Sequence, residues 1–257
     1  MALLETHFDS QVLGLSLGAN IILPEHPAAW NEPPAVLYLL HGLSDDNTIW
    51  CRRTSIERYA NRYNLAIVMP DAYKSFYTNM AHGSDYWSFF STELPTLVKR
   101  WFNVSNDWKK TFVAGISMGG YGAMRLALGN PGMFCAAASL SGALDLASHI
   151  HDEWDDCRLR TFKATFGSLE QLRNSDDDLI AQLQTMETIP ETEFYIDVGT
   201  EDYLYQDSVT FRDLAAEKGM YLTYEESAGE HRWDFWDTAI QRVLEWLPIE
   251  KLETPKN

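Results

Sequence analysis

The stretch Thr111–Pro131 reads TFVAGISMGGYGAMRLALGNP and decides the fold. Its short apolar run, Phe112–Ala114, is typical of a buried strand, and Tyr121–Leu128 has the apolar spacing of a helix. The helix is expected to end at Gly129-Asn130-Pro131, which supplies a glycine, a turn residue and a helix breaker in order. The sequence therefore predicts a strand, a tight turn and a helix in direct succession.

The predicted turn contains the pattern G-x-S-x-G, with Ser117 at its tip. A turn sharp enough to lift one hydroxyl above a sheet brings the backbone so close that a Cβ at Gly115 or Gly119 would clash. The turn also opens a helix, so the N–H of Met118 is expected to point toward a developing oxyanion. Ser117 is the predicted nucleophile. The alternative is that the pattern marks an ordinary strand-to-helix corner.

Short apolar runs alternate with segments of helical periodicity over most of the remaining chain. The runs are Val36–Leu40, Leu65–Met69, Ala136–Leu140, Phe194–Val198 and Tyr221–Tyr224, and the helical segments include Ser55–Tyr63, Phe89–Phe102 and Val209–Lys218. This alternation predicts an α/β fold with a mostly parallel sheet covered by helices on both faces. Leu3–Ser10 and Val12–Leu23 alternate with period two and end at Pro24, which predicts two antiparallel strands at the sheet edge.

The segment Asp145–Thr188 is the exception to this alternation. It is polar and acidic, has helical character and contains no strand pattern. We interpret residues 145–188 as a helical, cap-like insertion over the carboxyl ends of the strands, where ligands bind in open α/β sheets. With 257 residues and no linker or repeat, residues 1–257 are expected to form a single domain.

A serine hydroxyl is a weak nucleophile, so a base and an orienting acid must accompany it. In hydrolases with a serine at such a turn, the order along the chain is serine, acid, histidine, each after a strand. Three histidines follow Ser117, and only His231 comes after a late strand that could supply the acid. An amphipathic helix begins just after His231. His231 is the predicted base. The alternative is a histidine that merely begins that helix.

The acid should follow the strand Phe194–Val198. Asp202 lies just beyond this strand, so its carboxylate can reach the loop that carries the base, and it is the predicted acid. Asp197 lies inside the strand. Glu201 and Asp207 remain alternatives, either as substitutes or as surface carboxylates.

A second oxyanion donor is expected from the loop after Val36–Leu40, which reads HGLSDD from His41 to Asp46. Gly42 lets the backbone approach closely, so the N–H of Leu43 would pair with that of Met118. His41 is interpreted as a structural histidine that fixes this loop rather than as an acid or base.

Four motifs, HGLSDD, GISMGG, GTED and GEHRW, occur in this order and resemble the esterase D family, in its tributyrin esterase and feruloyl esterase branch of the α/β-hydrolases. The resemblance covers nearly the whole chain. It implies an α/β-hydrolase fold and a carboxylesterase acting on short acyl groups without a cofactor, and homo-oligomers are frequent among such relatives. It also implies Ser117 as nucleophile, Asp202 as acid, His231 as base, and Leu43 and Met118 as oxyanion donors.

One departure from the family pattern affects the expected substrate. S-formylglutathione hydrolases of this family usually have Thr-Cys after HGL, whereas this chain has Ser44-Asp45-Asp46-Asn47, so that thioester substrate ranks lower. Acyl transfer to an alcohol, as in the related mycolyltransferases, is one alternative, and a binding module on an inactive scaffold is another. Trp50, Tyr77 and Tyr86 are candidate substrate-binding residues or, equally, packing residues.

The composition restricts the partners and the location. Thirty-seven acidic and twenty basic side chains give a net charge of −17, which disfavours nucleic acid and anionic membrane surfaces and leaves a small-molecule ester as the expected partner. No apolar run approaches the length of a membrane-spanning helix. The N-terminal MALLETHFDSQ has no basic region before an apolar stretch, so no secretory signal is expected. Three widely spaced cysteines favour a reducing, cytoplasmic location.

No cofactor or metal is expected. The chain lacks a dinucleotide fingerprint and a phosphate-binding P-loop. A histidine and acid cluster at residues 149–157 offers metal-ligating side chains, but we interpret it as a solvated acidic loop, because a metal site needs fixed geometry and supporting hydrogen bonds.

Overall fold

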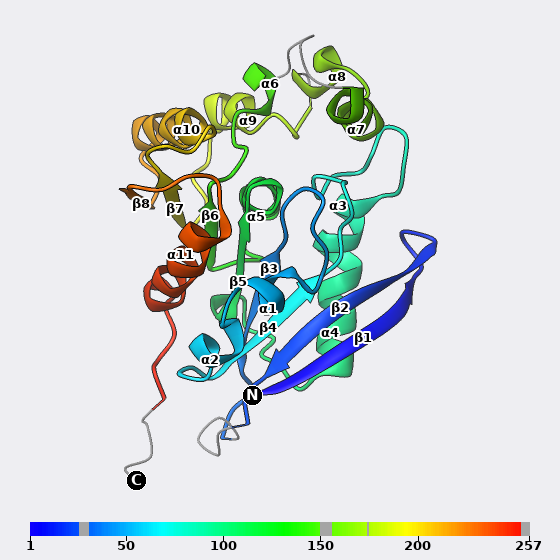
Figure 1. Ribbon diagram of the computed structural model, residues 1–257, viewed down its shortest axis with the longest axis vertical. Helices are drawn as coiled ribbons and strands as arrows, with labels where there is room; N and C mark the ends of the chain where they lie inside the picture. The colour runs from blue at the N-terminus through cyan, green and yellow to red at the C-terminus, as the bar shows by residue number, and fades with distance from the viewer. Residues whose placement is uncertain (26–30, 150–155, 174, 253–257) are drawn as a thin grey trace.

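The computed structural model describes residues 1–25, 31–149, 156–173 and 175–252. Its centre is a sheet with the strand order β1-β2-β4-β3-β5-β6-β7-β8 (Figure 1). The strands are β1 (Ala2–Ser10), β2 (Leu15–Leu23), β3 (Ala35–Leu40), β4 (Leu65–Pro70), β5 (Thr111–Ile116), β6 (Ala136–Leu140), β7 (Glu193–Gly199) and β8 (Leu222–Ser227). The expected strands are present with small shifts at their ends.

The sheet combines an antiparallel edge with a parallel body. β1 pairs with β2 and β2 with β4 in antiparallel directions, whereas all pairs from β4 through β8 are parallel. The first hairpin differs from the expected strand limits, because Val12 lies in its turn rather than in β2. Gly14 closes this turn with φ of 66°, a conformation that favours glycine, and its N–H donates to the carbonyl of Ser10.

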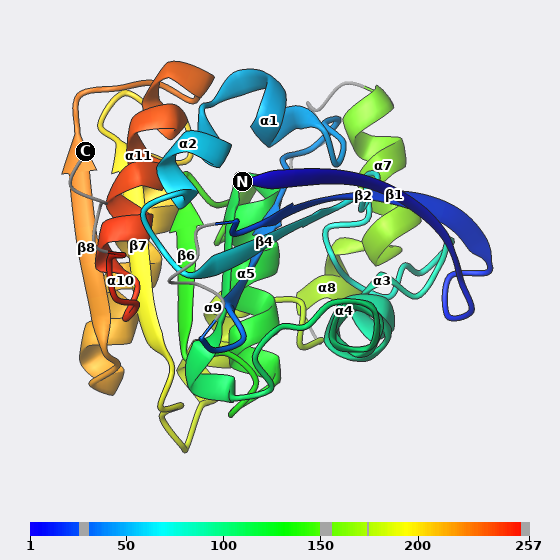
Figure 2. The same ribbon diagram turned by 90° about the horizontal axis from the view of Figure 1, so that it is seen from below.

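Helices cover both faces of the sheet. The helices are α1 (Ile49–Arg53), α2 (Ile56–Ala60), α3 (Tyr86–Ser88), α4 (Leu94–Trp101), α5 (Met118–Gly129), α6 (Leu146–His149), α7 (Asp156–Phe166), α8 (Leu169–Arg173), α9 (Leu179–Thr185), α10 (Tyr205–Lys218) and α11 (Trp233–Trp246). α1, α2 and α11 lie on one face, and α4 and α5 lie on the other (Figure 2). Within the described ranges, no helix is both long and apolar enough to cross a membrane.

Successive side chains of the central strands point to opposite faces of the sheet, so each strand contributes to the apolar core on both faces. Val36, Tyr38 and Leu40 of β3 face the layer of α4, α5 and α10, whereas Leu37 and Leu39 face the layer of α1, α2 and α11. All residues of β3 are buried, as are those of β4 and β5. Burial of apolar side chains on both faces is the condition under which parallel strands are stable.

The parallel strands end at one edge of the sheet, and the loops that follow them gather there. β5 leads into Ser117, β7 into Asp202 and β8 into His231, in line with the expected chain order. The segment between β6 and β7 contributes α6, α7, α8 and α9, which lie together at one end of the molecule (Figure 1). The sheet therefore brings residues far apart in sequence to one place.

Candidate active site

Ser117 occupies the sharp turn between β5 and α5. Its backbone has φ of 52° and ψ of −115°, which is uncommon for a residue with a side chain and costs energy. The flanking glycines permit the turn, because a Cβ on Gly115 would lie 2.4 Å from the carbonyl oxygen of Gly119. A Cβ on Gly119 would lie 2.6 Å from that of Leu40. The clash expected at both glycines is therefore present.

Three side chains from separate loops meet at this turn. The Oγ of Ser117 lies 3.0 Å from Nε2 of His231. On the other side of the ring, Nδ1 of His231 lies 3.0 and 2.9 Å from the two carboxylate oxygens of Asp202. All three distances are those of good hydrogen bonds.

The hydrogen bonds define the protonation state of the imidazole. A carboxylate can only accept, so Nδ1 of His231 carries a proton and donates it to Asp202. In neutral imidazole Nε2 is then bare and accepts the hydroxyl proton of Ser117. The side chain of Asp202 is fully buried, and the N–H of Leu204 also donates to it at 2.8 Å. The arrangement can therefore remove a proton from the serine and stabilise the resulting imidazolium.

The loop after β3 presents its backbone to the same place. Nδ1 of His41 donates to the carbonyl of Gly42 at 2.8 Å, and the N–H of Asp45 donates to the same oxygen at 3.2 Å. Because a trans peptide is planar, holding the carbonyl of Gly42 on one side directs the N–H of Leu43 to the opposite side. Met118 contributes the first N–H of α5. Both residues line the cavity at Ser117.

Comparison with known proteins assigns the chain to a family. The Esterase family model matches residues 10–247 of the chain. The chain belongs to the Esterase family. Fluorophosphonate-binding serine hydrolase F (FphF) of Staphylococcus aureus is 33% identical and has a TM-score of 0.88, with 96% of this chain and 98% of that one covered. The S-formylglutathione hydrolase FrmB of Staphylococcus aureus is also 33% identical over the same shares, with a TM-score of 0.85.

A further relative is also described as an esterase. The acetyl esterase of Caldicellulosiruptor saccharolyticus is 29% identical over 263 residues, which cover 96% of this chain and 98% of the relative. The protein is a carboxylic ester hydrolase, a serine esterase with the α/β-hydrolase fold. The fold class and the esterase D-like family expected from the sequence are thereby confirmed.

Two aromatic rings hold the imidazole of this esterase in place. The ring of Tyr203 lies 4.5 Å from that of His231, and the ring of Trp236 packs edge-on at 4.8 Å. Trp236 is itself fixed, because its indole N–H donates to the hydroxyl of Ser141 at 3.0 Å. Tyr203 directly follows Asp202, which was a local signal for its position, whereas the contact of Trp236 depends on how α11 packs.

Backbone contacts join the loop of Asp202 to the loop of His231. A Cβ on Gly199 would lie 2.1 Å from the carbonyl oxygen of Gly229, so the two loops touch. Glu201 strengthens this contact, because its carboxylate accepts the N–H of Gly229 at 2.6 Å. That hydrogen bond is the main cause that lowers the pKa of Glu201 below its ordinary value. Glu201 therefore lies beside the three side chains and fixes the loop of His231.

Two cavities meet at Ser117. The smaller, of about 170 Å³, is mostly apolar; its lining includes Met118, Phe76, Ala143, Leu146, Phe162 and Leu204. The larger, of about 450 Å³, includes Lys74, Asp45, Arg158, His231 and Trp233. Ser117 and Leu43 belong to both linings. A substrate that spans Ser117 would therefore have one part in an apolar cavity and the other in a wider, more polar one.

The candidate substrate-binding aromatics do not line these cavities. Trp50, Tyr77 and Tyr86 are 1%, 0% and 3% exposed. The indole N–H of Trp50 donates to the carbonyl of Leu40, and the hydroxyl of Tyr77 donates to that of His41. These three side chains are buried in the core, so their interpretation as packing residues replaces that as pocket walls. The pocket walls come instead largely from α7 and from the loops after β3 and β7.

The remaining acidic candidates have other partners. Asp197 is buried in β7 and pairs with Arg242 at 2.6 Å; burial raises its pKa, and Arg242 counteracts this rise. Asp207 is buried and accepts the N–H of Asp145 at 3.1 Å. The cluster at residues 149–157 falls largely on residues 150–155, which lie outside the described residues.

Proposed function

We propose that the protein is a serine carboxylesterase that hydrolyses short-chain acyl esters through Ser117, His231 and Asp202. The observation that carries the proposal is the continuous line of hydrogen bonds from the hydroxyl of Ser117 through His231 to the buried carboxylate of Asp202. The N–H groups of Leu43 and Met118 are the proposed oxyanion donors.

The proposed reaction has two halves. Ser117 attacks the ester carbonyl while Nε2 of His231 takes its proton, and the carbonyl oxygen becomes an oxyanion that accepts hydrogen bonds from Leu43 and Met118. When the tetrahedral species collapses, the bond to the alkoxy oxygen breaks, and His231 gives that oxygen its proton. Water then attacks the acyl-serine by the same route and releases the acid. Asp202 remains ionised throughout.

The cavities support a short acyl group and a larger alcohol part. The apolar cavity of about 170 Å³ has room for acetyl to butyryl chains, as in tributyrin-like esters. The larger cavity, with Lys74, Asp45 and Trp233 in its lining, suits a polar alcohol such as an acylated sugar, or an aromatic one. The acetyl esterase among the relatives is consistent with this size. A feruloyl group would require the larger cavity.

The replacement Ser117→Ala tests the proposal. Turnover of a p-nitrophenyl butyrate substrate should fall by at least about 10³-fold, because the nucleophile is lost while the turn is retained. A fluorophosphonate probe should label the parent protein and not the variant. Turnover near the parent rate in the alanine variant, with circular dichroism unchanged, would refute the assignment.

A second candidate is thioester hydrolysis. The S-formylglutathione hydrolase FrmB is 33% identical over 96% of this chain, which favours this candidate more than the residues after Gly42 suggested. The same serine and base would cleave a C–S bond by the same two halves. Comparison of kcat/KM for S-formylglutathione and for a formyl or acetyl ester of matched size separates the two. Product analysis with added alcohols tests acyl transfer.

We extend the proposal to the domain organisation and the location of the protein. We propose that residues 1–257 form one domain in which residues 145–188 act as a cap, because Leu146, Arg158 and Phe162 line the apolar cavity. We also propose a cytoplasmic location. Its support is chemical: the cysteines Cys51 and Cys135 are free thiols.

A further inference from the structure

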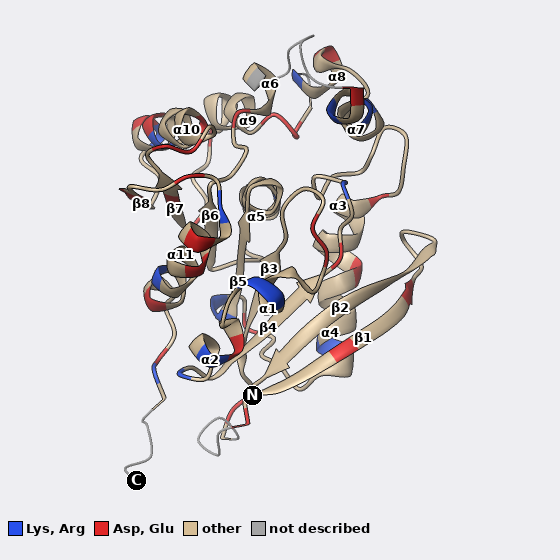
Figure 3. Ribbon diagram, in the orientation of Figure 1, with Lys and Arg blue, Asp and Glu red and all other residues tan. Residues whose placement is uncertain are grey.

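β1 is a long strand with an open edge. It has nine residues, and within the described part of the chain it pairs only with β2. It contains no proline and no lysine, the residues that commonly keep edge strands from pairing. Figure 3 shows acidic positions and no Lys or Arg along it. An unprotected edge of this length is a ready template for a further strand.

The pairing of β2 shows which backbone groups of β1 are open. The carbonyl of Gly18 accepts the N–H of Asp71, so Gly18 directs its backbone groups away from β1. His7 is opposite Gly18, and the backbone groups of His7 therefore also point away from β2, toward the open edge. Since this direction alternates along a strand, Leu3, Glu5 and Asp9 share it with His7. All four side chains are exposed.

A second copy of the chain fits this edge in a register that pairs all nine residues of β1. We propose that the protein forms a two-fold dimer by antiparallel pairing of β1 with β1 of a second copy, with Thr6 opposite Thr6. The open backbone groups of Glu5 then meet those of His7 of the second copy, and those of Leu3 meet those of Asp9. Two antiparallel strands exchange hydrogen bonds only where the opposite residues of both strands direct their backbone groups toward the partner strand.

The charges select this register over its neighbours. With Thr6 at the centre, each Glu5 is directly opposite a His7, which can donate a hydrogen bond or carry the opposite charge. A shift of the centre to Glu5 places two glutamates face to face. A shift to His7 places Glu5 opposite Asp9, which is again a like-charge pair. Like charges directly opposite each other on a sheet are destabilising.

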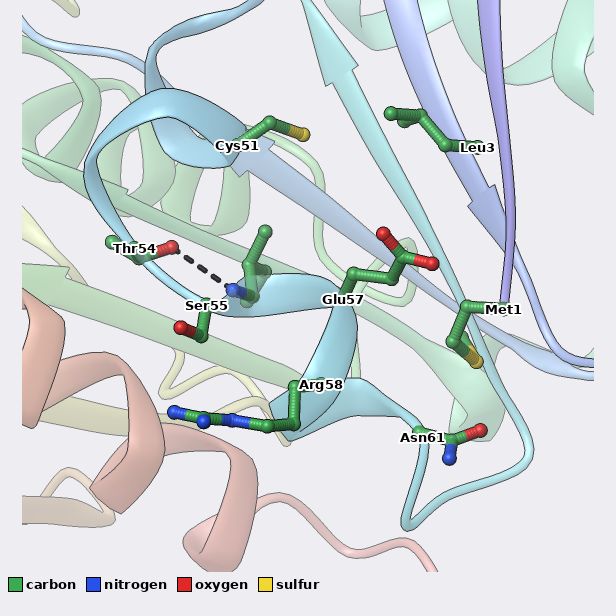
Figure 4. Close-up of a pocket in the computed structure, with 9 residues that line it drawn as sticks. Met1, Leu3, Cys51, Thr54, Ser55, Glu57, Arg58 and Asn61 are labelled. Atoms are coloured by element: carbon green, nitrogen blue, oxygen red, sulfur yellow. Dashed lines mark hydrogen bonds between the residues drawn. The ribbon is translucent and has the colours of Figure 1, made fainter.

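Apolar groups on both faces of β1 match the same register. Leu4 would pack across from Phe8 of the second copy, where Trp101, 45% exposed, already packs edge-on against Phe8 at 5.2 Å. On the other face, an open hollow of about 520 Å³ lies between the start of β1 and the α1–α2 segment (Figure 4). Met1 and Leu3 line it, and the register carries the partner hairpin, with exposed Val12, toward it.

The opposite edge of the sheet is less suited to self-pairing. β8 reads LTYEES and carries Glu225 and Glu226 in succession. Two copies of this strand would bring like charges together in a chain that is already strongly acidic. The geometry therefore points to β1 as the edge that associates.

Sedimentation velocity with the variant His7→Pro tests the interface. Proline removes the open N–H of His7 without removing a hydrogen bond to β2, so the hairpin should remain folded. The parent should sediment as a species with twice the mass of one chain, which is 29.4 kDa. The proline substitution should raise the dissociation constant of the dimer about 100-fold or more. The control His7→Ala keeps the N–H and should weaken the dimer only a few-fold. A parent that stays monomeric, or a dimer unaffected by proline, overturns the proposal.

Cysteine cross-linking tests the register. Under mild oxidation Thr6→Cys should form a covalent dimer, because the two positions lie directly opposite, whereas Glu5→Cys and His7→Cys should not. Cross-linking at position 5 or 7 instead of 6 overturns the register. Esterase turnover should be the same in His7→Pro and the parent, since β1 contributes no residue to the cavities at Ser117. Failure of the dimer and failure of the proposed reaction therefore give different results.

Discussion

His41 shows how one buried side chain can determine the direction of a backbone donor. Its Nδ1 donates to the carbonyl of Gly42, and its Nε2 accepts the N–H of Ala72 at 2.9 Å. The ring is therefore neutral and joins two loops. In the proposed reaction its effect passes through the peptide between Gly42 and Leu43, so His41 is a proposed positioning residue.

The variant His41→Phe should lower kcat by about 10- to 100-fold with little change in KM, because the proposed oxyanion donor, the N–H of Leu43, is no longer held in place. Stability should fall by about 1–3 kcal/mol, since buried groups lose their partners. The matched control is Trp50→Phe, which removes a comparable buried hydrogen bond to the carbonyl of Leu40. Steady-state kinetics should show kcat near the parent value for this control. Equal losses of kcat in both variants would argue for a general loss of structure.

Glu201 gives a prediction with a defined pH dependence. Its pKa is lowered, mainly by the N–H of Gly229, so its stabilising contribution is present above the ordinary glutamate pKa and lost as the pH falls through the lowered value. The thermal midpoint of Glu201→Gln should therefore lie below that of the parent by a constant amount from pH 6 to pH 8, with the gap closing below about pH 4. A gap that widens on acidification would contradict this assignment. Calorimetry at several pH values measures it.

At the scale of single elements, the sequence predicted best those structures that are determined by residues adjacent in the chain. The turn at Ser117 was predictable because two glycines, an apolar strand pattern and a helix pattern are all local. The helix predicted for Phe89–Phe102 was less accurate, because its first part, Phe89–Glu93, is a π-helix that leads into α4. No residue pattern in the segment indicates this change of helix type.

Helix α7 offers a test of how one element sets the acyl preference. Phe162 lines the apolar cavity, so Phe162→Ala should enlarge it and raise the hexanoyl-to-butyryl ratio of kcat/KM by about tenfold. Phe166, equally buried at 5% and on the same helix, does not line the cavity. Phe166→Ala should lower the stability of the protein by a similar amount without changing the hexanoyl-to-butyryl ratio of kcat/KM. A p-nitrophenyl ester series measures both, and an equal shift in both variants would contradict the role of Phe162.

At the scale of the whole molecule, the sequence could identify residue types but not which cavity they would reach. Trp50, Tyr77 and Tyr86 were plausible pocket walls because aromatics near a catalytic loop often line pockets, yet all three are buried and line neither cavity at Ser117. Conversely, Phe162 and Arg158 come from the insertion that was expected over the strand ends, but no local pattern indicated that these two side chains would line the cavity. Long-range packing, unlike a turn, is determined by surfaces that are distant in sequence.

The proposed cap is joined to the body by a partly buried ion pair. Arg125 of α5, 7% exposed at its side chain, lies 3.0 Å from the carboxylate of Asp177, which also accepts the hydroxyl of Thr78. Trp87 covers the guanidinium at 3.9 Å. Asp177 therefore connects the helix of Ser117, the loop after β4 and the segment before α9.

Removing one partner of such a pair leaves the other charge without compensation in a poorly solvated place. Asp177→Ala should therefore reduce the free energy of unfolding by about 3 kcal/mol, as measured by urea denaturation. The control is Asp213→Ala, which breaks the exposed pair with Arg212 and should cost at most about 0.5 kcal/mol. If both variants lose the same small amount, the pair does not anchor the cap. A large loss in Asp177→Ala alone, with a raised KM, indicates that cap docking and the apolar cavity depend on this contact.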